Sequence, residues 1–273
     1  MTYNFYVDFL YFVSYSFLGW LCEVIYCSFL AKKFINRGFL NGPVCPIYGF
    51  GALMVVTFLL PVRQNIALVF ILGFILTTCL EYITSFAMEK MFHSKWWDYS
   101  DKKFNVNGRI CLLNSIMFGL LSVFAMFEIH PEIEKIIGNL SYVMVQAFAI
   151  IFIVIMTADT TISIQTVFSL NEKMQRVKEL SAEIKDRFDS RQLYMEEQLS
   201  ERITLLRENI QDSEKYKDMY ELVERLSGEI NKLYSTNKLL HRRLINAFPG
   251  MRSTKFQEQL QNIKHSIEKR KLK

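Results

Sequence analysis

Residues Glu89 to Arg109, EKMFHSKWWDYSDKKFNVNGR, form a dense polar stretch between two apolar segments. The stretch holds two adjacent tryptophans, a tyrosine, three acidic residues and six basic or potentially basic ones. Each flanking segment is apolar over about twenty residues, the length that an α-helix needs to cross a membrane. The stretch therefore predicts a loop at one membrane surface that covers polar groups inside a helical bundle.

The composition divides the chain into two parts. Residues 1–169 carry ten basic and ten acidic residues, whereas residues 170–273 carry twenty-two and seventeen, so the net charge of +5 belongs to the second part. All five cysteines lie in the first part, without a CxxC pair or a spacing typical of metal sites. We expect reduced, structural thiols and neither a metal nor a cofactor.

The hydropathy pattern predicts an all-α membrane bundle with five spans, at residues 6–30, 44–61, 66–89, 110–128 and 139–168. The second is short and contains Pro46, Gly49 and Gly51, which makes it the weakest of the five. The first lacks a basic leading region and is too long for the apolar core of a signal peptide, so we expect it to remain as a span.

The distribution of basic residues predicts the orientation of the bundle. The loops after the first and third spans hold three and five Lys or Arg residues, whereas those after the second and fourth hold only Arg63 and Lys135. Cytoplasmic loops are enriched in Lys and Arg. The pattern therefore places the N-terminus outside the cell and the basic tail in the cytosol.

Acidic residues inside the spans are the first candidates for a functional site. Glu23, Glu81 and Asp159 lie in three different spans at the predicted cytosolic side, and Glu89 lies at the boundary of the third span. Because an ionisable residue in a span is costly, it normally faces protein or water. Two readings stay open: a polar pocket for a solute or ion, or structural pairing with Arg37 and Arg109.

The two predicted cytosolic loops supply the rim of such a pocket. In the second loop the candidates are Trp96, Trp97, Asp98, Tyr99, Asn107 and Arg109, with Gly108 shaping the turn. In the first loop and the helix that follows, the residues expected to shape the path are Gly38, Gly42, Pro43, Pro46 and Gly49. The alternatives are an ordinary interfacial turn for the first loop and aromatic membrane anchors for the second.

Three segments carry a resemblance to a known family: NRGFLNGPVCPIYGFG (36–51), LEYITSFAMEKMFHSKWWDYS (80–100) and FNVNGRICLLNSIMFG (104–119). Over about residues 10–125 the chain resembles the bacterial CmpB-like permease family, described as putative ABC-transporter type IV. AFPGMRS (247–253) is similar to a closing motif in some members. The resemblance implies a permease of the bacterial cytoplasmic membrane with a separate ATPase subunit. The positions that carry it are Arg37, Gly38, Gly42, Pro43, Pro46, Tyr48, Gly49, Glu81, Glu89, Trp96, Trp97, Asp98, Tyr99, Asn107, Gly108 and Arg109.

The sequence of the tail is typical of a long helix. Residues 171–248 contain no proline and only Gly228, and apolar residues recur three and four apart in two runs with different registers. Asn237 occupies a position at which a buried Asn sets coiled-coil register. The tail at 170–248 is therefore predicted as a coiled coil joining two copies of the chain, or as a helical hairpin folding near residue 212. A short basic helix is expected within 249–273.

Motifs of common enzymes are missing from the sequence. It has no GxxxxGK[ST], HExxH, GxSxG or Rossmann glycine pattern, and its four histidines are scattered. The tail's basic residues alternate with acidic ones, which favours a solvated face over nucleic-acid binding. The best-supported hypothesis is a permease-like transport component that is not itself an enzyme. A membrane-anchored coiled-coil scaffold and a membrane-embedded enzyme are the alternatives.

Overall fold

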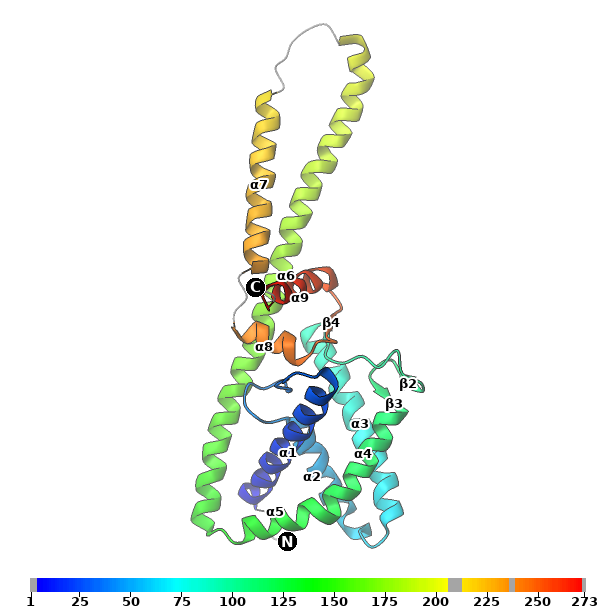
Figure 1. Cartoon of the computed structure of the whole chain (residues 1–273), viewed down its shortest axis with the longest axis vertical. Coiled ribbons are helices and arrows are strands. Elements are labelled where there is room, and N and C mark those ends of the chain that lie inside the picture. The colour runs from blue at the N-terminus through cyan, green and yellow to red at the C-terminus, as the bar shows by residue number, and fades with distance from the viewer. Residues whose placement is uncertain (1–3, 206–212, 236–238, 272–273) are drawn as a thin grey trace. The chain divides into compact units, whose positions relative to one another are not determined.

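The structure, a computed structural model, describes residues 4–205, 213–235 and 239–271 of the chain, and these residues are mainly helical (Figure 1). They divide into two compact units. The first, here the membrane unit, comprises Met1–Val167 and Arg243–Lys255. The second, here the tail unit, comprises Phe168–Arg242 and Phe256–Lys273.

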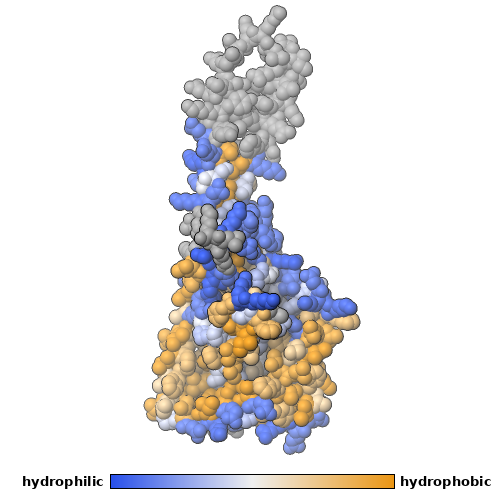
Figure 2. Space-filling model, viewed as in Figure 1, coloured by the Kyte–Doolittle hydropathy of each residue, from blue (hydrophilic) through white to orange (hydrophobic). Residues whose placement is uncertain are grey.

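In the described part of the chain, four helical segments are long and apolar enough to cross a membrane: Phe5–Phe29, Ile66–Phe92, Leu112–Gly138 and Tyr142–Asp186. They belong to α1 (Phe5–Ala31), to α3 (Ile66–Phe92), to α4 (Leu112–Phe124) with the π-helical η2 (Ala125–Ile129) and α5 (His130–Gly138), and to α6 (Tyr142–Leu205). Figure 2 shows apolar side chains covering much of the visible face of this unit. The chain is therefore a mainly helical, multi-pass membrane protein of the all-α class, as the sequence predicts.

The second predicted span is a shorter apolar helix. It consists of α2 (Pro46–Leu59) and the 3₁₀ turn η1 (Leu60–Val62), seventeen residues in all. Pro46 is the first residue of α2, where a proline costs no helical hydrogen bond because the first turn has no acceptor for its N–H. The other predicted spans overlap with the four long segments, although the third and fourth segments continue to Gly138 and Asp186, beyond the predicted ends at 128 and 168.

Capping residues in the sequence explain where the long helices begin. The side chain of Asn4 accepts a hydrogen bond from the N–H of Tyr6 at the start of α1, and Asn65 accepts one from Leu68 at the start of α3. The residues that follow α1 and α3, Lys32 and His93, both adopt the left-handed conformation that stops a helix.

Small residues bring α1 and α2 close together. A Cβ atom on Gly49 would lie 2.2 Å from Ser16 Oγ and 2.7 Å from the carbonyl oxygen of Phe12. A Cβ atom on Gly19 would lie 2.2 Å from Cβ of Tyr48. Helices associate in membranes through such close packing of small residues. Gly49 therefore permits the close contact between α1 and α2. The sequence predicts only that it shapes the path of the first loop and the helix that follows.

Four two-residue strands order the loops: β1 (Ser94–Lys95), β2 (Asn105–Val106), β3 (Ile110–Cys111) and β4 (Arg252–Ser253). Strands β2 and β3 form a hairpin whose turn, Asn107 and Gly108, has positive φ at both residues, at 55° and 68°. Strand β1 pairs with β4 in antiparallel register. Residues Arg243–Lys255, here the docking segment, thus lie against the loop that follows α3.

The tail unit has a core of its own. Buried apolar residues come from α6, α7 (Ser213–Ser235) and α9 (Gln257–Lys271) and include Met174, Val177, Leu226, Leu260 and Ile263. The chain reverses within this unit, because Ser169 Oγ lies 2.6 Å from Nε2 of His241 in α8 (Leu239–Ala247).

Much of the predicted heptad pattern lies outside the described side chains. This holds for Phe188, Met195, Leu199, Ile203, Leu206, Ile210, Tyr216, Met219 and Asn237. Association of two copies through a coiled coil therefore stays a prediction.

Gly49 and Gly51, two residues apart on α2, allow a matched test of the helix contact. Replacing Gly49→Ala forces α1 and α2 apart and should cost about 1–3 kcal/mol, as overpacking typically does. Replacing Gly51→Ala puts a Cβ 3.5 Å from Leu80 Cδ2, an ordinary contact, and improves helix propensity. Thermal unfolding in detergent should show a lower midpoint for Gly49→Ala only. Equal midpoints for the two variants would contradict the proposed contact.

Candidate functional site

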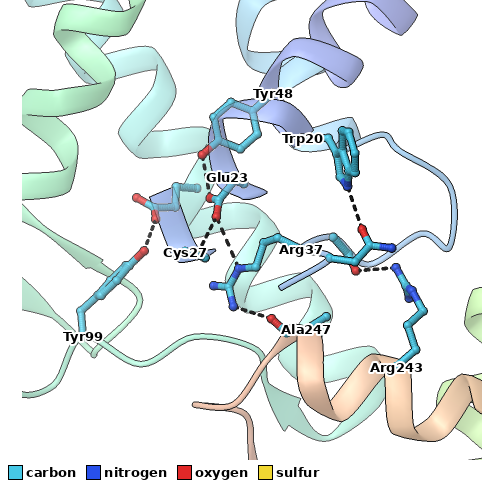
Figure 3. A network of polar contacts seen from close by, with 11 residues as sticks. Trp20, Glu23, Cys27, Arg37, Tyr48, Tyr99, Arg243 and Ala247 are labelled. Atoms are coloured by element: carbon cyan, nitrogen blue, oxygen red, sulfur yellow. Dashed lines mark hydrogen bonds and ion pairs between the residues drawn. The ribbon is translucent and has the colours of Figure 1, made fainter. Parts of the chain in front are cut away.

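Glu23 on α1 is the centre of a polar network at the end of the bundle that carries the first loop (Figure 3). Its Oε2 lies 3.4 Å from Nε of Arg37, and the Tyr48 hydroxyl donates to its Oε1 at 2.7 Å. The thiol of Cys27, one turn further along α1, donates to Oε2 at 3.5 Å. Both carboxylate oxygens are therefore satisfied, and Arg37 supplies the compensating charge.

Glu81 on α3 has a different environment. The residue is 5% exposed, and the hydroxyl of Tyr99 donates to its Oε1 at 3.2 Å. Its Oε2 is buried without a hydrogen-bond partner among the described residues. The pKa of Tyr99 is raised, mainly by burial and then by the charges of Glu81 and Glu23. Tyr99 therefore lies close enough to both carboxylates for their charges to act on its hydroxyl. The three side chains form one cluster.

Asp159 on α6 holds the first loop. Its Oδ1 accepts from the backbone N–H and the side-chain amide of Asn41, at 2.9 and 2.8 Å, and its Oδ2 accepts from the N–H of Gly42 at 2.7 Å. The hydroxyl of Ser163 donates to Oδ1 at 3.3 Å. A carboxylate with this many donors is stable in its charged form. Asp159 thus has a structural role, fixing the path of the loop.

Glu89 and Arg109 form a second ion pair, with Oε2 and Nη2 2.7 Å apart. The Arg109 guanidinium also lies 5.3 Å from the ring centre of Phe86, and its backbone carbonyl accepts from Nε1 of Trp97 at 2.9 Å. Asn107 donates to the hydroxyl of Tyr82 at 3.0 Å. These contacts hold the second loop on the end of α3.

The docking segment meets the first loop through two arginines. Nη2 of Arg243 donates to the carbonyl oxygen of Gly38 at 3.0 Å and also to that of Leu40. Nη1 of Arg37 donates to the carbonyl oxygen of Ala247 at 2.6 Å, and its guanidinium lies 4.8 Å from the ring centre of Phe248. Gly38 adopts a φ of 128°, a conformation that favours glycine. In this conformation its carbonyl oxygen accepts the hydrogen bond from Arg243.

Electrostatics support the same arrangement. Burial lowers the pKa of Arg243, whereas the charge of Asp159 opposes this shift. A guanidinium remains protonated in proteins. Arg243 therefore brings a permanent positive charge near Asp159 while it binds the loop carbonyls.

Trp96 and Asp98 connect the docking segment to the second loop. Trp96 is 3% exposed, and its ring lies against Phe39, Phe92 and Phe248, with centroid distances of 5.1, 6.0 and 5.0 Å. The carboxylate of Asp98 lies 3.0 Å from Nη1 of Arg252. The pKa of Asp98 is lowered, chiefly by the hydrogen bond from the Ser100 hydroxyl and with a contribution from Arg252.

The residues predicted for one pocket thus fall into separate groups. Glu23, Arg37, Glu81 and Tyr99 belong to one cluster, here the polar cluster, together with Tyr48. Asp159 holds the first loop, and Glu89, Trp97, Asn107 and Arg109 order the second. Pro43 is exposed. Among the residues described here, no group of three or more His, Cys, Asp or Glu is arranged to hold a metal ion.

Sequence reasoning missed several participants. Tyr48 is part of the motif PIYGFG but had no assigned role, although a tyrosine one turn into an apolar helix is a hydrogen-bond donor that needs a partner. Arg243, Phe248 and Arg252 lie more than 200 residues from the first loop; the AFPGMRS motif contains Phe248 and Arg252, whereas no sequence motif indicates Arg243. No local pattern indicates which loop they contact.

Four apolar helices of spanning length, closed at one end by ordered polar loops, define the chain as a multi-pass membrane protein. The family model described as "Putative ABC-transporter type IV" matches residues 10–164, more than half of the chain, and the chain belongs to this family. The matched region contains the polar cluster and Asp159 and ends before the docking segment. No curated protein and no solved structure matches the chain.

A double-mutant cycle can measure the energetic coupling between Glu23 and Arg37. Arg37→Ala leaves the Glu23 carboxylate without a counter-charge and should destabilise the protein by about 2 kcal/mol, less than a fully buried pair would cost because both side chains keep some exposure. Thermal unfolding of the purified protein in detergent measures the effect, with the exposed Arg63→Ala as control.

Adding Glu23→Gln to Arg37→Ala removes the unpaired charge and should recover part of the loss. If the double variant is less stable than Arg37→Ala by the full effect of Glu23→Gln alone, the two residues are not coupled.

Proposed function

We propose that this chain is the membrane component of a transporter and works with a separate ATP-hydrolysing subunit. The observation that carries the proposal is the polar cluster, in which two carboxylates, an arginine and two tyrosines meet within an apolar helical bundle. Ionisable groups inside a membrane bundle are costly, so a cluster of them is a candidate solute or ion pathway. Membership of the transporter family supports the same function.

The chemistry of the cluster favours a cationic or zwitterionic solute. Glu81 offers an unpartnered carboxylate oxygen, which suits a positively charged or N–H-bearing group. Arg37, next to Glu23, suits a carboxylate of the same solute. In the orientation expected from the positive-inside rule, the cluster and the docking segment face the cytosol.

The family description and the sequence together support a separate ATP-hydrolysing subunit. The chain has no phosphate-binding glycine loop, so ATP hydrolysis would need another protein. The loops and the docking segment form an ordered surface at the end of the bundle that such a subunit could contact. Ion pairs and aromatic packing connect this surface to the loop that carries Arg37.

Inside-out vesicles from cells that express the chain with its native partners test this function. With ATP, the wild type should accumulate at least one cationic or zwitterionic solute, detected by untargeted mass spectrometry. Glu81→Gln should abolish the accumulation, because it removes the carboxylate that binds the cationic group. Glu128→Gln, which alters an exposed glutamate in η2, should retain it.

Purification of the tagged full-length chain in mild detergent gives the second readout. An ATP-hydrolysing subunit should co-purify in constant ratio with the wild type and with Glu81→Gln. Vesicles without any ATP-dependent solute difference, together with purified protein that lacks an ATPase, would contradict the proposal.

A membrane-anchored scaffold is the second candidate, favoured by the separate buried core of the tail unit. In that case Glu81→Gln would complement a strain lacking the gene as well as the wild type does. A chain ending at Val167 would fail to complement. For a transporter, both variants fail.

A further inference from the structure

The two glutamates of the polar cluster differ in how their charge is compensated. Glu23 has a guanidinium at 3.4 Å and two donors, the Tyr48 hydroxyl and the Cys27 thiol. Glu81 has a single donor, the Tyr99 hydroxyl, and no ion pair among the described residues. An isolated buried carboxylate is far more costly than a neutral acid. The difference therefore points to two protonation states in one cluster.

The surroundings of Glu81 favour its neutral form. Glu81 is 95% buried, since only 5% of the residue is exposed, and the groups that act on it are Tyr99 and Glu23. Tyr99 is held neutral because burial raises its pKa. Glu23 is a like charge, and Arg37 is engaged with Glu23 and with the carbonyl oxygen of Ala247. Two carboxylates in one site disfavour simultaneous ionisation.

We propose that Glu81 is an exchangeable proton-binding site, in which Oε2 carries the proton while the Glu23 carboxylate stays ionised against Arg37. Tyr99 is a positioning residue, because its hydroxyl fixes Oε1 and leaves Oε2 for the proton. The site deepens the proposed transport function on which it rests: a cationic solute would displace the proton from Glu81, so that solute and proton exchange at one carboxylate.

A hydrophobic carbodiimide provides a direct test, because dicyclohexylcarbodiimide enters apolar regions and adds to protonated carboxylic acids. The full-length protein in detergent is treated over a range of pH from about 5 to 9, the interval in which buried glutamates can titrate. Peptide mass spectrometry then locates the added reagent. Glu81 should be modified, and the modification should decline as the pH rises.

Matched variants make the assignment specific. Glu81→Gln should lose the label, whereas Glu128→Gln should retain it. Labelling of Glu23 should be weaker than that of Glu81, because Arg37 pairs with the Glu23 carboxylate. Tyr99→Phe removes a hydrogen bond that favours the charged carboxylate, so half-maximal labelling should move to higher pH. Thermal unfolding verifies that each variant is folded.

Three outcomes would overturn the proposal: an unmodified Glu81 at every pH, modification that does not depend on pH, or equal modification of Glu23. The test needs neither solute nor partner subunit. Labelling of Glu81 in a chain that transports nothing would refute the transport function and leave the proton site standing. Transport by a chain whose Glu81 is never labelled would refute the proton site and leave the transport function standing.

Discussion

Arg37 joins the interior of the bundle to a segment of the chain more than 200 residues away. Its Nε pairs with Glu23 on α1, its Nη1 binds the carbonyl oxygen of Ala247, and its guanidinium lies over the ring of Phe248. A planar guanidinium can serve these partners at the same time, which a lysine could not. The position of the docking segment and the charge balance of the polar cluster therefore depend on one side chain.

This arrangement couples the docking segment to the polar cluster. Arg243 binds the carbonyls of the loop that carries Arg37, Asp159 holds the next residues of that loop, and Trp96 packs on Phe248. A displacement of the docking segment would therefore withdraw Arg37 from Glu23 and leave the Glu23 carboxylate without its counter-charge. In the proposed transporter, a partner that acts on the loops would change the affinity of the polar cluster for protons and cations in this way.

Hydropathy predicted the apolar helices of the membrane unit, because it is a local property of the sequence. The long spans and the short second helix followed from it, whereas the orientation drawn from the basic residues and the coiled coil of the tail stay predictions. The contacts that each polar or aromatic side chain makes could not be predicted in the same way. Asp159 holds Asn41 and Gly42 and does not belong to the polar cluster, and Trp96 packs in an aromatic group that includes Phe248. Contacts between residues distant in sequence leave no trace in local periodicity, so these roles needed the structure.

Cross-linking of Ser94→Cys with Ser253→Cys in the full-length protein tests the docking most directly. The two serines are register partners in β1 and β4, and the flanking hydrogen bond from Thr254 N–H to the His93 carbonyl marks a pair whose Cα atoms lie about 4.5 Å apart, within disulfide range. Mild oxidation in native membranes should join the two residues within one chain, as peptide mass spectrometry would detect. The pair Ser141→Cys and Ser253→Cys serves as the control and should stay unlinked. A link that forms only between two chains, or no link, would contradict the account.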